Sequence, residues 1–186
     1  MARVLVPLAQ GCEELEAVTI IDLLRRAGIE VVSAGLDNQP VKASRGVILL
    51  PDTTLDEALK QDYDMIALPG GMPGMTNLKN DPRIIALLKN MAAAGKYTCA
   101  ICAAPVVLAE AGLLSSKRAT SYPGFLDKLN LPGVSYLNDA VVTDGKIITS
   151  RGPGTAMDFA LALIETLLGK MKRNEVEAGL QRARGC

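Results

Sequence analysis

Cys102 is the side chain of this sequence that is best placed for covalent chemistry. It lies in the run Thr98–Pro105, where a strand pattern leads directly into a helix pattern. A cysteine at such a junction resembles a nucleophile elbow, in which a strained turn presents the side chain above the end of a sheet. The unpaired N–H groups at the helix start favour a thiolate, so we expect the pKa of Cys102 to be lowered. The alternative is a buried structural cysteine.

The absence of histidine restricts the partners that Cys102 can have. None of the 186 residues is histidine. This excludes Cys-His and Ser-His catalytic pairs within one chain, and it excludes zinc sites that use histidine. Any general acid or base must therefore be Glu, Asp, Lys, Tyr or Cys.

Glu16 is the candidate for that acid or base. It belongs to the acidic loop Gly11–Glu16, which begins a helix. Glu13 and Glu14 are accounted for as first-turn residues that complement the helix dipole. Glu16 can instead turn toward the strand ends where Cys102 lies. A carboxyl group next to a thiolate has a raised pKa, so it can hold a proton and donate it.

A glycine pair follows another strand, in the run Leu68–Gly71. Two glycines allow the backbone to approach closely and leave the N–H of Gly71 uncovered. Together with the N–H of Ala103, this donor would form an oxyanion hole, and Gly70 would line the same pocket. By pattern alone the pair is also compatible with a simple turn. It is not a phosphate loop, because no Gly-Lys-Ser/Thr follows.

The remaining cysteines are expected to have other roles. Cys99 and Cys102 form a Cys-x-x-Cys pattern, but Cys99 lies inside the strand. Three extended residues span roughly 10 Å, whereas bridged Cα atoms lie within about 7 Å. We therefore expect Cys99 in the core and no disulfide. Cys12 is expected to be partly exposed in the first loop, and Cys186 is the last residue.

Strand and helix patterns alternate along the chain and must position these loops. The alternation predicts an α/β fold with a mostly parallel sheet, helices on both faces, and ligands at the carboxyl ends of the strands. In the first helix, Leu15, Val18, Ile21, Leu23 and Leu24 form the expected buried face. Strands are predicted at 4–8, 29–34, 46–50, 63–68 and 97–101, a hairpin at 140–149, and helices at 13–27, 55–59, 81–94, 103–111 and 153–168, before a last amphipathic helix.

Composition limits the class of protein. Hydrophobic residues make up 49% of the chain, and 20 basic residues balance 20 acidic ones. Stable nucleic-acid binding is not expected without net positive charge. No apolar run approaches the roughly 18 residues of a membrane span, and no targeting segment is recognised. Four cysteines indicate separate thiols in a reducing compartment. We expect one cytoplasmic domain over residues 1–186, with no cofactor and no metal.

Several motifs in order resemble the ThiJ/PfpI superfamily, and within it the branch of the parkinsonism-associated deglycase and its bacterial relatives. These motifs are Glu13–Val18, Arg25–Ile29, Ser44–Val47, Leu68–Gly71, Ala100–Pro105 and Thr149–Thr155. The resemblance implies a flavodoxin-like three-layer sandwich, similar to class I glutamine amidotransferase domains, that forms a homodimer.

The resemblance also implies roles for individual residues. Cys102 would be the elbow cysteine and Glu16 the protonated acid hydrogen-bonded to it. Gly71 and Ala103 would supply backbone donors, and Arg45 would lie near the site at the dimer interface. Pro153 belongs to a Gly/Pro segment that either walls the pocket or simply begins a helix.

The activity implied is a glyoxalase without cofactor that also removes early glyoxal and methylglyoxal adducts from proteins and nucleotides. A cysteine that oxidises readily, with a role in stress sensing or as a chaperone, is the alternative. Many members have a histidine near the cysteine, where this sequence has Tyr122. Tyr122 either donates a hydrogen bond or fills space, and a peptidase is disfavoured.

Overall fold

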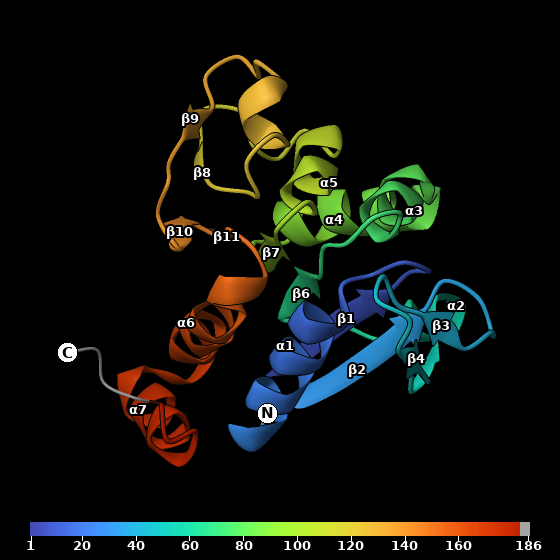
Figure 1. Cartoon of the computed structure of the whole chain (residues 1–186), viewed down its shortest axis with the longest axis vertical. Coiled ribbons are helices and arrows are strands. Elements are labelled where there is room, and N and C mark those ends of the chain that lie inside the picture. Colours follow the sequence, from blue (N-terminus) through green and yellow to red (C-terminus); the bar gives the residue numbers. More distant parts are fainter. Residues whose placement is uncertain (183–186) are drawn as a thin grey trace.

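A seven-stranded sheet runs through the middle of the computed structural model, which describes residues 1–182 (Figure 1). The strand order is β10-β11-β7-β6-β1-β2-β5, and all neighbours are parallel except the hairpin β10–β11. The predicted α/β class is confirmed. The strands are β1 Arg3–Leu8, β2 Glu30–Gly35, β5 Thr53–Thr54, β6 Met65–Leu68, β7 Tyr97–Ile101, β10 Val141–Asp144 and β11 Ile147–Ser150.

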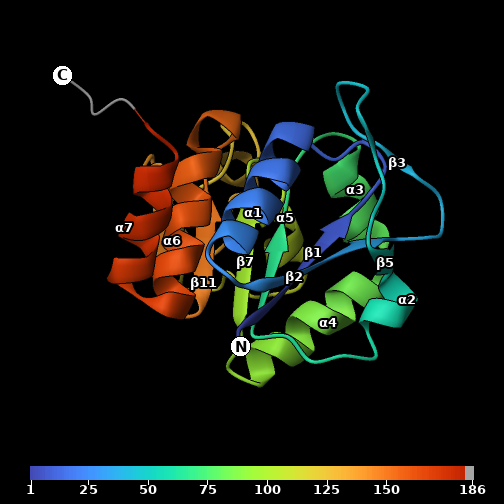
Figure 2. The same ribbon diagram turned by 90° about the horizontal axis from the view of Figure 1, so that it is seen from below.

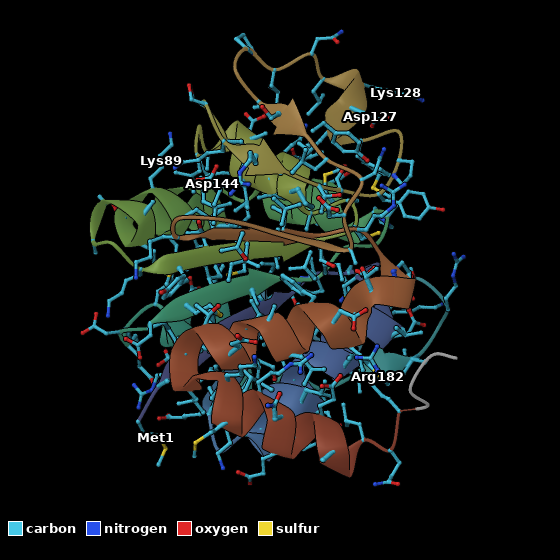
Figure 3. The ribbon with its side chains drawn as sticks, turned by 90° about the vertical axis from the view of Figure 1, so that its left-hand side faces the viewer. Met1, Lys89, Asp127, Lys128, Asp144 and Arg182 are labelled. Atoms are coloured by element: carbon cyan, nitrogen blue, oxygen red, sulfur yellow. The ribbon has the colours of Figure 1, made fainter. Side chains whose placement is uncertain are left out.

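Helices cover the sheet on both faces and complete three layers. Figure 3 shows the sheet edge-on, and α1, α6 and α7 lie together on one side of it. Helices α4 and α5 lie on the other side with α3, while the short α2 packs at the β2–β5 edge (Figure 2). The helices are α1 Glu14–Arg26, α2 Leu55–Ala58, α3 Gly74–Asn80, α4 Pro82–Ala93, α5 Pro105–Glu110, α6 Ala156–Leu168 and α7 Lys170–Gly179.

Smaller elements surround the carboxyl ends of the strands. Two two-stranded ladders join β3 Val41–Lys42 to β4 Ile48–Leu49, and β8 Arg118–Ala119 to β9 Ser135–Tyr136. Short 3₁₀ turns occupy Leu126–Lys128 and Pro153–Thr155. The sequence pattern did not resolve β3, β5, β8, β9 or α3, because two-residue strands and a helix starting in a Gly/Pro-rich loop give too little periodicity.

The buried face of α1 differs from the prediction. Leu15 and Val18 were expected inside, but they are 51% and 48% exposed. Ile21 is half-buried, and the buried residues are Glu16, Ala17, Ile20, Leu23 and Leu24. The prediction was wrong because it assigned the helix face by hydrophobicity, whereas this helix turns a carboxylic acid toward the sheet and leaves two aliphatic residues outside.

Two predicted helices begin later than expected. The helix after β7 starts at Pro105, since residues 102–104 form the turn. The helix predicted from residue 153 starts at Ala156, after the 3₁₀ turn. Among residues 1–182, no helix combines the length and apolar character needed to cross a membrane.

Candidate active site

The turn between β7 and α5 holds Cys102 in a left-handed conformation, with φ of +64°. This conformation costs a residue other than glycine about 1–3 kcal/mol, so surrounding contacts must impose it. The Cys102 N–H donates to the Ser150 carbonyl at 3.0 Å, and the Cys102 carbonyl accepts from the Tyr122 N–H at 2.8 Å. These bonds to two other segments hold the backbone in the geometry of the predicted elbow.

Glu16 lies in the first turn of α1 and is completely buried. Its Oε2 accepts the Gly70 N–H at 2.8 Å, and its carboxyl group lies beside Cys102, since both side chains pack against Gly70. Its Oε1 receives no N–H or O–H donor from residues 1–182. A buried oxygen without a hydrogen-bond donor is costly for a charged carboxylate but much less so for a protonated carboxylic acid.

The pKa of Glu16 is raised to about 7, as predicted. Burial is the main cause, because it disfavours the charged form. The hydrogen bond from the Gly70 N–H and the neighbouring Cys102 thiol act in the opposite direction. The reason therefore differs from the one expected, which was the charge of a neighbouring thiolate.

The prediction of a lowered pKa for Cys102 is wrong, since the pKa is raised to about 12. Burial contributes most, followed by the negatively charged Glu16 carboxyl beside the sulfur. The N–H groups of Ala103 and Gly71 do lower the pKa, as expected of them, but they are outweighed. A proton on Glu16 removes the charge beside the sulfur, so the thiolate is favoured in the state in which Glu16 is neutral.

The glycine pair after β6 brings the backbone against both side chains. A Cβ atom on Gly70 would lie 2.6 Å from Cys102 Cβ and 2.9 Å from Glu16 Oε2. Gly71 has a φ of +93°, and a Cβ there would collide with the Gly11–Glu13 backbone. The Gly70 N–H is thereby directed to Glu16, and the Gly71 N–H lies close enough to the Cys102 sulfur to lower its pKa.

A cavity of about 370 Å³ opens above Cys102. It includes the predicted residues Cys102, Gly71, Ala103, Arg45, Tyr122 and Pro153. Gly70 does not line it but lies against Cys102 and Glu16. The other lining residues, which the sequence pattern did not indicate, are Glu13, Ser44, Met72 and Phe125.

Hydrogen bonds between two loops position the Arg45 side of this cavity. The Ser44 hydroxyl donates to Glu13 at 2.8 Å, and the Arg45 N–H donates to Glu14 at 3.0 Å. Glu13 and Glu14 therefore fix the Ser44–Val47 loop in addition to their place at the start of α1. The sequence carried one signal of this contact, which was a hydroxyl side chain next to Arg45 together with the acidic loop Gly11–Glu16.

Tyr122 forms the opposite wall and is 47% exposed. Its ring meets the Phe125 ring edge-on, with 6.3 Å between centroids. Among residues 1–182, its hydroxyl donates no hydrogen bond to another residue. The contacts present are those of a packing residue.

The other cysteines are arranged differently from Cys102. Cys99 is buried and free, which confirms the prediction of no disulfide. Cys12 is also buried, contrary to the prediction, because the loop at Gly74 packs directly on its backbone. Cys186 lies outside the described residues. Within residues 1–182, no three His, Cys, Asp or Glu side chains are grouped to hold a metal ion.

Comparison with known proteins identifies the family. Residues 2–166 match the DJ-1/PfpI family. The chain belongs to this family. It is 47% identical over 178 residues to the protein dj-1beta of Drosophila melanogaster, covering 95% of each chain. The crystal structure of Drosophila DJ-1beta matches with a TM-score of 0.94 and 45% identity, over 98% of this chain and 99% of that one.

Two further relatives have names that describe an activity or a chemical state. The glutathione-independent glyoxalase DJR-1.2 of Caenorhabditis elegans is 39% identical over 175 residues, covering 94% of this chain and 92% of the relative. The structure of oxidized DJ-1 from Toxoplasma gondii matches with a TM-score of 0.94 and 42% identity, over 99% of this chain and 100% of that one. The resemblance found in the sequence is therefore confirmed, both for the family and for its DJ-1 branch.

Replacement of Glu16 by Gln is expected to change how stability depends on pH. Because the folded-state pKa of Glu16 is raised to about 7, its stabilising contribution is present below pH 4.5 and is lost as the pH rises through 7. Between pH 4.5 and 8, the free energy of unfolding should therefore fall by about 3 kcal/mol less in Glu16→Gln than in wild type. Urea unfolding at both pH values measures this difference.

Glu14→Gln is the matched control. Backbone and hydroxyl donors at Arg45, Val47 and Ser44 lower the pKa of Glu14 despite its partial desolvation, so its contribution to stability is lost at low pH instead. The two variants should deviate from wild type in opposite directions. A Glu16→Gln protein with the same pH dependence as wild type would contradict the assignment of a buried, protonated Glu16.

Proposed function

We propose that this protein is a cysteine-dependent glyoxalase and deglycase that needs no cofactor and acts on methylglyoxal or its early adducts. The observation that carries the proposal is the pair formed by Cys102, which lines the cavity, and the buried Glu16 carboxyl, which lies beside it behind Gly70. A relative named as a glutathione-independent glyoxalase supports it. Free thiols at Cys12, Cys99 and Cys102 agree with action in the reducing cytoplasm.

The reaction begins with addition of the Cys102 sulfur to the aldehyde carbon of methylglyoxal. One C–S bond forms, and the aldehyde oxygen becomes an oxyanion. The N–H groups of Gly71 and Ala103, which lie beside the sulfur, donate to that oxyanion. One such donor contributes roughly 3–4 kcal/mol of transition-state stabilisation.

Glu16 then moves protons between the two carbons of the bound substrate. It protonates the oxyanion, moves the proton of the former aldehyde carbon to the former ketone carbon, and passes the hydroxyl proton of the first carbon to the oxygen of the former ketone. The first carbon is oxidised to a thioester and the second is reduced to an alcohol, so no external oxidant is needed. Water cleaves the C–S bond, which releases lactate and restores the Cys102 thiol.

The first test is turnover of methylglyoxal by wild type and Cys102→Ala in buffers without free thiols. Loss of the nucleophile should lower lactate formation by more than about a thousandfold. Cys99→Ala is the matched control, since it removes the same group from β7, away from the cavity. An equal rate in wild type and Cys102→Ala would contradict the mechanism, and a negligible rate in wild type would contradict the activity.

A redox-sensing or chaperone role with little turnover is the second candidate. It is supported by the solved relative described as oxidized and by the access that the cavity gives to the Cys102 sulfur. A sulfinate at this position would be met by the N–H groups of Gly71 and Ala103 and by the proton of Glu16. Catalysis and sensing use the same site and are compatible.

Mild peroxide treatment is expected to add about 32 Da, the mass of two oxygen atoms, at Cys102 alone among the described cysteines. Cys12 and Cys99 are completely buried, whereas Cys102 is 9% exposed to the cavity. Peptide mapping by mass spectrometry locates the shift, and Cys102→Ala should lack it. Equal oxidation of Cys12, Cys99 and Cys102 would contradict a sensing role.

We also propose that the protein forms a homodimer through the outer face of α1 and the adjoining Ser44–Leu50 segment. Leu15 and Val18 are half exposed on α1, and Ile48 and Leu50 are 60% and 82% exposed beside them. The Val47 N–H donates to Glu14 at 3.4 Å, which joins the two segments into one apolar surface. This surface adjoins Arg45, so the interface would lie next to the cavity.

Val18→Asp is expected to weaken this dimer by at least about tenfold in dissociation constant, because a carboxylate would lose its water within an apolar interface. Sedimentation velocity over a range of concentrations measures the change. Met171→Asp is the matched control, since Met171 is 87% exposed on α7, away from α1. A wild-type monomer, or equal effects of both variants, would contradict this interface.

A further inference from the structure

A second hollow lies directly beside the reaction cavity. It has a volume of about 230 Å³ and is formed by residues 151–155 together with Tyr122 and Pro123. Tyr122 and Pro153 line both spaces, so the two adjoin. Residues 151–155 connect β11 to α6 in Figure 1. A molecule whose reactive end lies at Cys102 can therefore extend into this hollow.

The polar atoms of this segment are already used by the protein. The Gly152 N–H donates to Thr155 Oγ1 at 3.1 Å, and the Gly152 carbonyl accepts the Thr155 N–H at 2.9 Å. Thr155 Oγ1 lies 2.7 Å from the Ser150 hydroxyl. Pro123 and Pro153 have no N–H. The hollow therefore offers a ligand an aromatic ring, proline rings and glycine carbon atoms, but few free hydrogen-bonding groups.

The rim of the hollow carries a positive charge. Arg151 contributes to the lining, and its Nη1 donates to the Asn138 side-chain oxygen at 3.0 Å. An amide is neutral, so this contact orients the guanidinium without neutralising it. The surface is thus apolar with a cation at its edge, which complements an apolar group that is followed by a carboxylate.

We propose that this hollow binds the non-reacting part of a peptide adduct, namely an apolar side chain next to a carboxylate. The inference rests on the proposed function and specifies its substrate class. A nucleobase is disfavoured, because its hydrogen-bonding edges would be left without partners against Pro123 and Pro153. A peptide cysteine that carries methylglyoxal and is followed by a C-terminal leucine fits the arrangement.

The transfer of the adduct is balanced without further reagents. The bond between the peptide sulfur and the methylglyoxal carbon breaks, and the hydroxyl proton of the adduct passes to the departing sulfur. The aldehyde that results adds the Cys102 sulfur and proceeds as free methylglyoxal does. The hollow would hold the peptide while this carbon moves to Cys102, which makes capture more frequent than from solution.

Two probe peptides, N-acetyl-Cys-Leu and N-acetyl-Cys-Gly, test the hollow by calorimetry without any turnover. Burial of the leucine side chain should give the first peptide about tenfold tighter binding. Gly154→Leu should remove this preference, because a Cβ at Gly154 meets no atom within 4 Å and a side chain there has room to reduce the hollow. Gly179→Leu on α7 is the matched control, since it also meets no atom within 4 Å.

Lactate formation from the two methylglyoxal adducts, at equal concentrations of free methylglyoxal, is the second measurement. The Cys-Leu adduct should react about tenfold faster than the Cys-Gly adduct in wild type and Gly179→Leu, but not in Gly154→Leu. Equal binding of both peptides, or equal rates that follow free methylglyoxal alone, would overturn the inference. Absence of turnover with retained peptide selectivity would refute the proposed function while leaving the hollow as a peptide site.

Discussion

The close approach of the Cys102 thiol and the buried Glu16 carboxyl is the interaction on which the rest of the site depends. A buried carboxylate is costly unless donors surround it, and Glu16 has one N–H donor, from Gly70. Protonation of Glu16 avoids this cost, and the raised pKa of Glu16 shows that burial favours the protonated form. The same proton removes negative charge from beside the sulfur. Burial of Glu16 thus assists ionisation of Cys102, although burial of Cys102 itself opposes it.

This pair constrains backbone that lies far apart in the sequence. Glu16 and Cys102 approach closely only because Gly70 has no side chain between them. The conformation of Cys102 is held in turn by Ser150 at the end of β11 and by the Tyr122 N–H. Residues from four loops therefore meet where β1, β6, β7 and β11 end, as the topology of a parallel sheet requires. The positive φ of Cys102 is a strained backbone conformation, and these contacts offset its free-energy cost. The same conformation directs the sulfur into the cavity.

Much of this arrangement could be predicted from the sequence, and the failures have physical causes. The parallel sheet and the elbow follow from local patterns, because strand and helix periods differ and Cys102 lies where they meet. The buried face of α1 could not be assigned from hydrophobicity, since Glu16 is buried for its chemistry while Leu15 and Val18 are exposed. The raised pKa of Cys102 was missed because helix-start donors are visible in a sequence, whereas the degree of burial is a property of the whole fold.

The beginning of α1 contributes both to the site and to the exposed apolar face of the helix. Glu16 follows Leu15 directly and precedes Val18 by two residues, so one turn of helix presents an acid to the site and aliphatic groups to the outside. Glu14 in the same turn holds the Arg45 backbone at the cavity. A partner that packs against Leu15 and Val18 would therefore contact the same part of α1 that positions both Glu16 and Arg45.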